Sequence, residues 1–237
     1  MAIEFDGSSG YIPVQDNTNL RPVNITLACW FRLRNVNAGS TLISKAQSGP
    51  PWGSPFLSWM IRVNSSSALE MDVGNTTTYS AFSVTISPVM VANQWYHACL
   101  TYNGTTLTAY FDGAVKGTNG TVTGNINYSG NAVLLGANHG ASPAFQYISG
   151  SLADVRIYNR ALTTPEVVSL YASRGKYHPN INGLIGYWPL DDKSIGGSMT
   201  AERILDRSQY NHFGTGSGGG VYIGQRVLSY GGTYGVT

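Results

Sequence analysis

The stretch GSLADVRIYNRALTTPEVVSLY, residues 150–171, decides the fold of this chain. Its first half is typical of a strand, and its second half is typical of one short helix that follows without a linker. The apolar residues of the strand are Leu152, Val155, Ile157 and Tyr158. The stretch therefore predicts a strand followed at once by a single short helix, in a chain otherwise rich in strand patterns.

The helix carries its own start signal. Thr163 or Thr164 can accept a hydrogen bond from the free amides of the first turn, and Pro165 stands where a missing N–H costs nothing. Glu166 complements the positive end of the helix dipole. The apolar face expected for this helix is formed by Val167, Val168, Leu170 and Tyr171. We therefore expect one short helix over residues 164–172.

Composition favours short strands joined by tight turns. The 237 residues include 29 glycines, and only 11% are charged. All-β sandwiches of this length are commonly single domains. The formal net charge is +2 and no basic run occurs, so we expect no nucleic-acid partner. No apolar stretch approaches the roughly 18 residues of a membrane-spanning helix, so we expect no membrane insertion.

Alternation of apolar and polar residues predicts strands along most of the chain. In residues 24–33, NITLACWFRL, one face carries Ile25, Leu27, Cys29, Phe31 and Leu33. The other strands predicted before the helix cover residues 2–5, 11–14, 41–45, 56–63, 68–73, 94–102, 106–111 and 132–135. Residues 74–86 form a stretch rich in Thr and Ser, and Asp112-Gly113 is typical of a hairpin turn. Many short strands with frequent turns predict an all-β sandwich or barrel.

Four motifs carry a resemblance to a known family. They are MAIEFDGSSGYIPV, NITLACWFRL, QWYHACLTYNGTTLTAYFDG and the stretch 150–171, in this order within residues 1–175. Together they resemble the concanavalin A-like, laminin-G-like family, to which the pentraxins are related. The resemblance implies a two-sheet antiparallel jelly-roll sandwich with a curved concave face.

The residues after 175 depart from the family's order. GLIGYWPL (183–190) and ILDRSQYNHFGT (204–215) resemble the strand and turn that open a domain in this family, yet here they come last. The strands can complete the same sandwich in circularly permuted order, pair with a neighbouring subunit, or begin a truncated second domain. We favour permutation, because about 50 residues are marginal for a separate core. Residues 176–237 would then supply these strands, the linker GSGGG (216–220) and a terminal edge strand, 221–234.

Cys29 and Cys99 are the only cysteines. Pentraxins carry a disulfide between two strands at what look like these positions, so the resemblance implies that the two residues lie close together. A bridge requires neighbouring strands with both side chains on one face and Cα atoms about 5.5 Å apart. An oxidised pair would suit an extracellular or virion setting, and two buried thiols would suit the cytosol.

The sequence offers weak support for catalysis. Glu70 and Asp72 resemble part of the acidic strand motif of laminarinase-like glycoside hydrolases, and residues i and i+2 share a strand face. The third acid of that motif is missing, because the chain continues Gly74-Asn75-Thr76. The simpler interpretation is a solvated strand edge, and we predict that the protein is not an enzyme.

Calcium is the one cofactor that the resemblance implies. Related sandwiches hold this ion near the first strand, with ligands that resemble Asp6 and Asp154 together with loop carbonyls. Calcium takes six to eight oxygens, which two carboxylates and several carbonyls can supply. The alternative is that Asp6 makes an Asx turn and Asp154 bonds to the backbone.

Aromatic and amide side chains in loops are the candidate ligand-binding residues. Flat aromatic faces beside Asn and Ser suit sugar rings, which present C–H patches together with hydroxyls. The ligand-binding residues that we predict are Trp52, Asn138, His139, Phe145 and Tyr147. Trp59 alternates with Leu57 and Ile61, which favours a place in the core or on a sheet surface.

Two classes of function follow. The first is a structural and adhesive module on the surface of a large assembly, because the chain enters its first strand without a visible signal peptide and resembles sandwiches of bacteriophage virions. Its partners would be copies of itself, other structural proteins and cell-surface glycans. The second is a secreted, calcium-dependent carbohydrate-binding module. A laminarinase-like hydrolase is a weaker third.

Overall fold

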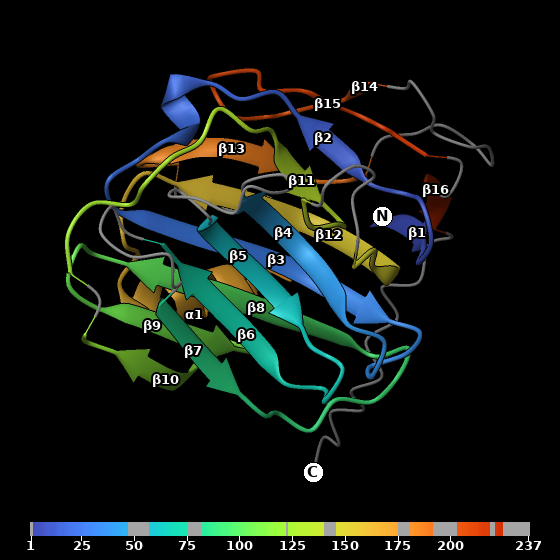
Figure 1. Cartoon of the computed structure of the whole chain (residues 1–237), viewed down its shortest axis with the longest axis horizontal. Coiled ribbons are helices and arrows are strands. Elements are labelled where there is room, and N and C mark those ends of the chain that lie inside the picture. The colour runs from blue at the N-terminus through green and yellow to red at the C-terminus, as the bar shows by residue number, and fades with distance from the viewer. Residues whose placement is uncertain are drawn as a thin grey trace, which may run out of the picture.

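The computed structural model describes residues 2–46, 57–74, 82–121, 123–139, 146–174, 181–191, 203–218 and 221–224. Two antiparallel sheets pack face to face, with sheet 2 in front of sheet 1 in Figure 1. The strands of sheet 1 are β1 (Ala2–Asp6), β3 (Ile25–Leu33), β8 (Trp95–Tyr102), β9 (Leu107–Phe111), β10 (Ala114–Asn119), β12 (Ser149–Tyr158), β13 (Leu184–Trp188) and β16 (Val221–Gly224). The strands of sheet 2 are β2 (Ile12–Val14), β4 (Ser40–Ala46), β5 (Leu57–Val63), β6 (Leu69–Val73), β7 (Phe82–Ile86), β11 (Val133–Leu135), β14 (Arg203–Ile204) and β15 (Gly214–Thr215). The predicted all-β, two-sheet jelly-roll sandwich is confirmed.

Strand order within the sheets brings distant parts of the chain together. Sheet 1 runs β10-β9-β8-β3-β12-β1-β16, and β13 pairs with β12 beyond the end of β1. Sheet 2 runs β14-β15-β2-β11-β4-β5-β6-β7. In the described part of the chain, the strands after residue 175 therefore pair within the chain, with β12, β1 and β2. The division of the chain into two units at residue 175 stays a prediction.

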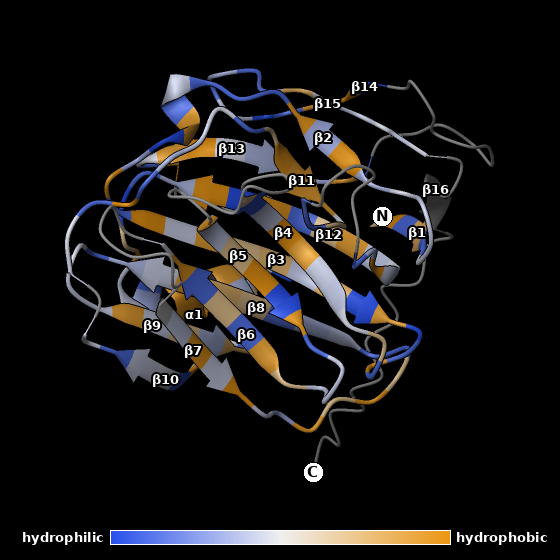
Figure 2. Cartoon of the chain, in the orientation of Figure 1, coloured by the Kyte–Doolittle hydropathy of each residue, from blue (hydrophilic) through white to orange (hydrophobic). Residues whose placement is uncertain are grey.

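The core lies between the sheets. Ile25, Leu27, Cys29, Phe31 and Leu33 all join its central cluster, as the alternation of β3 predicts. Each strand therefore carries apolar residues toward the opposite sheet and others away from it, which appears as alternating colours along the ribbons in Figure 2. The interpretation of Trp59 as a core residue is confirmed, since its side chain is fully buried.

Helix α1 (Thr164–Ala172) confirms the predicted helix and covers the outer face of sheet 1. Thr163 is its N-cap, and the Glu166 carboxylate accepts from the Thr163 amide at 2.8 Å. Val167 and Leu170 are buried against the sheet. Val168 is 46% exposed, so its assignment to the apolar face is wrong. Successive residues of a helix are about 100° apart around its axis, so Val168 is turned away from the side on which Val167 and Leu170 contact the sheet.

Two strands and one short helix were not predicted. β7 lies in the stretch rich in Thr and Ser, and β10 follows the Asp112-Gly113 turn with mostly exposed residues. A 3-10 helix, η1, spans Thr18–Leu20. Neither of the helices among the described residues has the length and apolar character needed to cross a membrane.

Candidate functional site

Asp6 ends β1 and organises the turn that follows. Its Oδ1 accepts hydrogen bonds from the amides of Ser8, Ser9 and Gly10 at 2.9–3.1 Å. Its Oδ2 accepts from the hydroxyls of Ser8 and Ser9. Partial burial raises the pKa of Asp6, but these bonds outweigh it and hold the pKa well below its usual range. The arrangement is the Asx-turn alternative, in which both carboxylate oxygens serve the loop.

Asp154 is held by a buried partner two residues along β12. Its Oδ1 accepts from Nε and Nη2 of Arg156 at 2.9 and 2.8 Å, and both side chains are almost fully buried. The Arg156 guanidinium also lies 4.4 Å from the centre of the Tyr187 ring. Burial raises the pKa of Asp154, against the opposing effect of Arg156. Its φ of 51° lies at a bulge in the pairing of β12 with β3.

Asp6 and Asp154, the two predicted calcium ligands, lie far apart along β12 and its ladder with β1. Asp6 lies opposite Ser149 in the β1–β12 ladder, and Asp154 lies five positions farther along β12. At about 3.3 Å per residue, five positions correspond to about 16 Å along the strand, whereas the oxygen ligands of one calcium ion lie about 2.3–2.6 Å from it. The described residues contain no group of three or more His, Cys, Asp or Glu side chains arranged for a metal. Each carboxylate is engaged by its own local partners, and whether either one binds calcium stays a prediction.

The predicted ligand-binding residues that the structure describes lie in the chain between β11 and β12. Asn138 is buried, and its Nδ2 donates to Gln146 Oε1 at 3.2 Å, whereas its Oδ1 has no partner. The His139 Nε2 lies 2.8 Å from the Ala132 carbonyl. Tyr147 packs against Tyr11, with ring centres 6.1 Å apart. The predicted residues Trp52 and Phe145 lie outside the described residues. Whether these five residues bind a ligand stays a prediction.

The two cysteines lie on neighbouring strands but on opposite faces of sheet 1. Cys29 is directly opposite Ala98, and Cys99 is directly opposite Ala28. Cys29 therefore points into the core, and Cys99 points toward helix α1. Both thiols are free and buried, and burial raises the pKa of each far above its usual value. Of the two alternatives, the structure has the pair of buried thiols and not the candidate disulfide, because a shift of one residue in register reverses the face of a side chain.

The outer face of sheet 2 carries polar side chains that sequence reasoning did not assign to a site. Leu69, Met71 and Val73 of β6 point into the core, so Glu70 and Asp72 point outward. Arg62 of β5 lies directly opposite Glu70, which lies directly opposite Thr85 of β7. We call Arg62, Glu70 and Thr85 the polar row.

Hydrogen bonds fix the geometry of the polar row. A guanidinium nitrogen of Arg62 lies 2.6 Å from Glu70 Oε2, and Asn64 Nδ2 donates to Glu70 Oε1 at 2.5 Å. The side chain of Arg62 is 30% exposed and that of Glu70 is 17% exposed. Thr85 is exposed. The row therefore presents a fixed planar donor, a fixed carboxylate and a free hydroxyl on one accessible surface.

Asp72 lies beside the polar row and is only 3% exposed. Its Oδ1 accepts a hydrogen bond from the exposed hydroxyl of Ser83, directly opposite on β7. Burial raises the pKa of Asp72 to about 6, although Ser83 and Arg62 act in the other direction. The interpretation of these acids as a solvated strand edge is wrong, because β6 lies between β5 and β7.

Sequence reasoning found the shared face of Glu70 and Asp72 but missed their partners. The polar row joins three strands separated by loops, and only the register places Arg62 opposite Glu70. Residues 57–63, LSWMIRV, contained a usable signal, because Arg62 is the one charged residue of this strand.

Comparisons with known proteins agree with this architecture. A laminin G family model described as "Concanavalin A-like lectin/glucanases superfamily" matches residues 6–168. A search of the curated proteins finds no match.

Among solved structures, one similar to this chain is described as "a putative carbohydrate binding protein" from Bacteroides ovatus, with a TM-score of 0.67 and 18% identity over 93% of this chain. This chain spans 58% of the length of that protein. A heptameric SAP-like pentraxin from Limulus polyphemus has a TM-score of 0.59 and 18% identity, covering 82% of this chain and 90% of the pentraxin. The CBM40 domain of the Ruminococcus gnavus IT-sialidase, solved bound to α2,3-sialyllactose, has a TM-score of 0.59 and 12% identity, covering 72% and 97% of the two chains. By the match of its family model over more than half its length, the chain belongs to the concanavalin A-like lectin/glucanases superfamily.

Proposed function

We propose that the protein is a non-catalytic glycan-binding module that holds its ligand on the outer face of sheet 2. The observation that carries this proposal is the polar row of Arg62, Glu70 and Thr85, with the exposed Ser83 beside it. Sugars offer neighbouring hydroxyls that both donate and accept. A guanidinium donates, a carboxylate accepts and a hydroxyl does either, so the row matches each need of a sugar diol.

The comparisons support this choice of ligand class. The superfamily is described by lectins and glucanases, and two of the similar structures are described as carbohydrate binding or as bound to a sialylated sugar. Binding sites in such domains need a rigid support for a few fixed polar groups. The last three strands of sheet 2, β5, β6 and β7, provide that support here.

The hydrogen bonds of the two carboxylates favour binding over hydrolysis. Retaining glycosidases need two carboxyl groups about 5–5.5 Å apart, one as a nucleophile and one as a proton donor. Glu70 is engaged by Arg62 and Asn64, and Asp72 is bonded to Ser83. Gly74 stands where the third acid of the laminarinase-like motif would be. Turnover of β-glucan by the purified protein, lost in Glu70→Gln, would overturn the non-catalytic assignment.

A glycan array tests the proposed function. Arg62→Met removes the donor but keeps the length of the side chain, and we expect binding of the best array ligand to fall about tenfold, the loss of one or two hydrogen bonds to a charged group. Arg207→Met is the matched control, because Arg207 lies after β14 at the far edge of sheet 2 and pairs with Asp191. Equal binding by the wild type and Arg62→Met would contradict the proposed site. Repeating the array with and without calcium tests the calcium-dependent alternative.

We propose further that the module works on the surface of a larger assembly, such as a virion, as a decoration or fibre protein that brings this face to cell-surface glycans. A secreted carbohydrate-binding module is the alternative setting. Co-purification with capsid or tail proteins, or a symmetric oligomer at low concentration, supports the assembly. A monomer found free in culture medium would favour the secreted module.

A further inference from the structure

The two sheets approach each other closely along one side of the sandwich, where β7 of sheet 2 meets β10 of sheet 1. A Cβ atom on Gly117 of β10 would lie 2.7 Å from Val84 Cγ1 of β7, so only glycine permits this contact. Asn119 Nδ2 donates to the Ser83 carbonyl at 3.2 Å across the same seam. At these residues β7 and β10 are therefore in direct contact, with no space between the two sheets.

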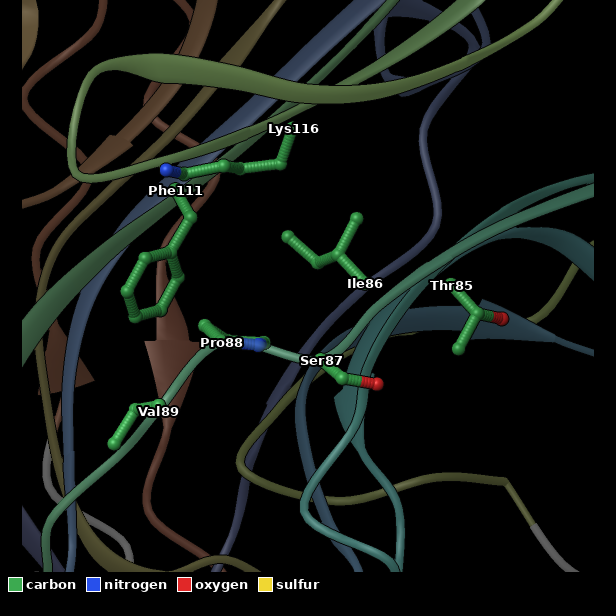
Figure 3. A pocket seen from close by; sticks show the side chains of 7 residues that line it. All are labelled: Thr85, Ile86, Ser87, Pro88, Val89, Phe111 and Lys116. Atoms are coloured by element: carbon green, nitrogen blue, oxygen red, sulfur yellow. The ribbon is translucent and has the colours of Figure 1, made fainter.

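Toward the end of β7 the seam opens into a pocket of about 520 Å³. The residues that line it are Thr85, Ile86, Ser87, Pro88, Val89, Phe111 and Lys116. Figure 3 shows Ile86 and Phe111 directed into the same space, with Lys116 along one side and Pro88 and Val89 along another. The volume lies in the range of small-molecule sites. Thr85 lines the pocket and is also a member of the polar row, so the pocket adjoins the polar row.

Lys116 supplies the positive charge of the pocket. Lys116 is the extra residue of a bulge, since Val115 pairs with Tyr110 and Gly117 pairs with Ala109. Bulges redirect a side chain out of the regular alternation of a strand. Lys116 forms no ion pair or ring contact among the described residues, although its charge acts on Asp112, where it opposes the rise in pKa that burial causes.

We propose that this pocket binds an acidic sugar residue, a pyranose that carries a carboxylate, at one end of the glycan held by the polar row. This inference rests on the proposed function. Lys116 meets the carboxylate, and no carboxylate side chain lines the pocket to compete for it. The side chains of Pro88 and of Val89, which is 90% exposed, meet the C–H face of the sugar, and the mostly buried ring of Phe111 forms the apolar floor behind them. The hydroxyls of Ser87 and Thr85 meet its ring hydroxyls.

The test compares glycans that differ only in the acidic residue. The first pair of probes is lactose and α2,3-sialyllactose, and the second is a galactose oligomer and an oligogalacturonate of equal length. Each probe is titrated into the whole protein, and binding is measured by calorimetry at low and at high salt. We expect the acidic member of at least one pair to bind about tenfold more tightly, and high salt to reduce this preference. Lys116→Met should remove the preference and leave binding of the neutral member unchanged. Lys116→Arg should restore most of it, and the control Arg207→Met should keep it.

The outcomes separate the inference from the proposed function. Loss of the acidic preference in Lys116→Met, with neutral binding intact, supports the pocket. A preference that persists in Lys116→Met, or the absence of any preference in a wild type that binds neutral glycans, overturns the pocket and leaves the glycan-binding proposal standing. A wild type that binds no glycan overturns both. Increased self-association of Lys116→Met without any change in sugar binding identifies a lysine that only protects an edge strand, and this also overturns the pocket.

Discussion

The outer faces of the two sheets differ in how they treat their polar side chains. On sheet 1, helix α1 covers part of the face, and Arg156 with its partner Asp154, as well as His97, are buried. Burial lowers the pKa of His97 to about 3, which keeps it neutral between Trp30 and Tyr171. On sheet 2, Arg62 and Glu70 are partly exposed, and Thr85 and Ser83 are exposed. Similar charged pairs therefore have different consequences: Asp154 and Arg156 stabilise the fold, whereas Arg62 and Glu70 remain accessible to a ligand.

The largest expected effect comes from removing the strands that support the covered face. Deletion of residues 183–237 removes β13 and with it the fully buried Trp188, and bares the edge of β12. We expect an insoluble or aggregating product, because an unpaired strand edge templates association. Expression trials with size-exclusion chromatography measure this. A soluble, monomeric fragment with the melting transition of the whole chain would contradict the pairing of β13 with β12.

The second prediction applies one kind of change to both faces. Asp154→Ala leaves the buried Arg156 without its carboxylate and should lower the free energy of unfolding by about 3–5 kcal/mol. Glu70→Ala removes the partner of the partly exposed Arg62 and should cost less than about 1 kcal/mol. Urea denaturation measures both. Similar losses at the two positions would remove the distinction between the faces.

The third prediction concerns pH and Asp72. Its pKa is raised from 3.8 to about 6 in the folded protein, so the folded state holds this proton more tightly than the unfolded state. Stability from this group is present below about pH 4 and is lost as the pH rises through about 6. Asp72→Asn should therefore stabilise the protein by roughly 3 kcal/mol at pH 7.5 and have little effect near pH 4. Thermal melts across this range check it, and a benefit that does not change with pH would refute the buried, ionising carboxyl.

The smallest expected effect is none at all, and it concerns the cysteines. Cys29 and Cys99 lie on opposite faces of sheet 1, so adding reductant should leave Tm unchanged. A thiol reagent should label neither residue until the protein unfolds. Intact mass spectrometry that shows the native protein lacking two hydrogens would demonstrate a bridge and refute the register of β3 and β8.

The sequence predicted features that depend on local pattern. The alternation of residues 24–33 predicted which residues of β3 enter the core, and the signals at Thr163–Glu166 predicted where α1 begins. The exposed β10 was missed because its residues lack an apolar pattern, and its place follows from pairing with β9.

The site could not be predicted in the same way, because it depends on register. Alternation places Glu70 and Asp72 on one face, but it cannot say that Arg62 lies opposite the first or that the second is buried. The same limit applies to the cysteines, whose proximity was implied by the resemblance to pentraxins: they lie on neighbouring strands, but a one-residue offset places them on opposite faces.

An NMR titration tests the central claim most directly. The ligand is the tightest glycan from the array, added to isotope-labelled protein while the backbone amide shifts are followed. The account predicts that the largest changes occur at Arg62, Glu70, Ser83 and Thr85, with residues of α1 unaffected. Changes centred on α1 and the outer face of sheet 1, or no change at saturating glycan, would contradict it.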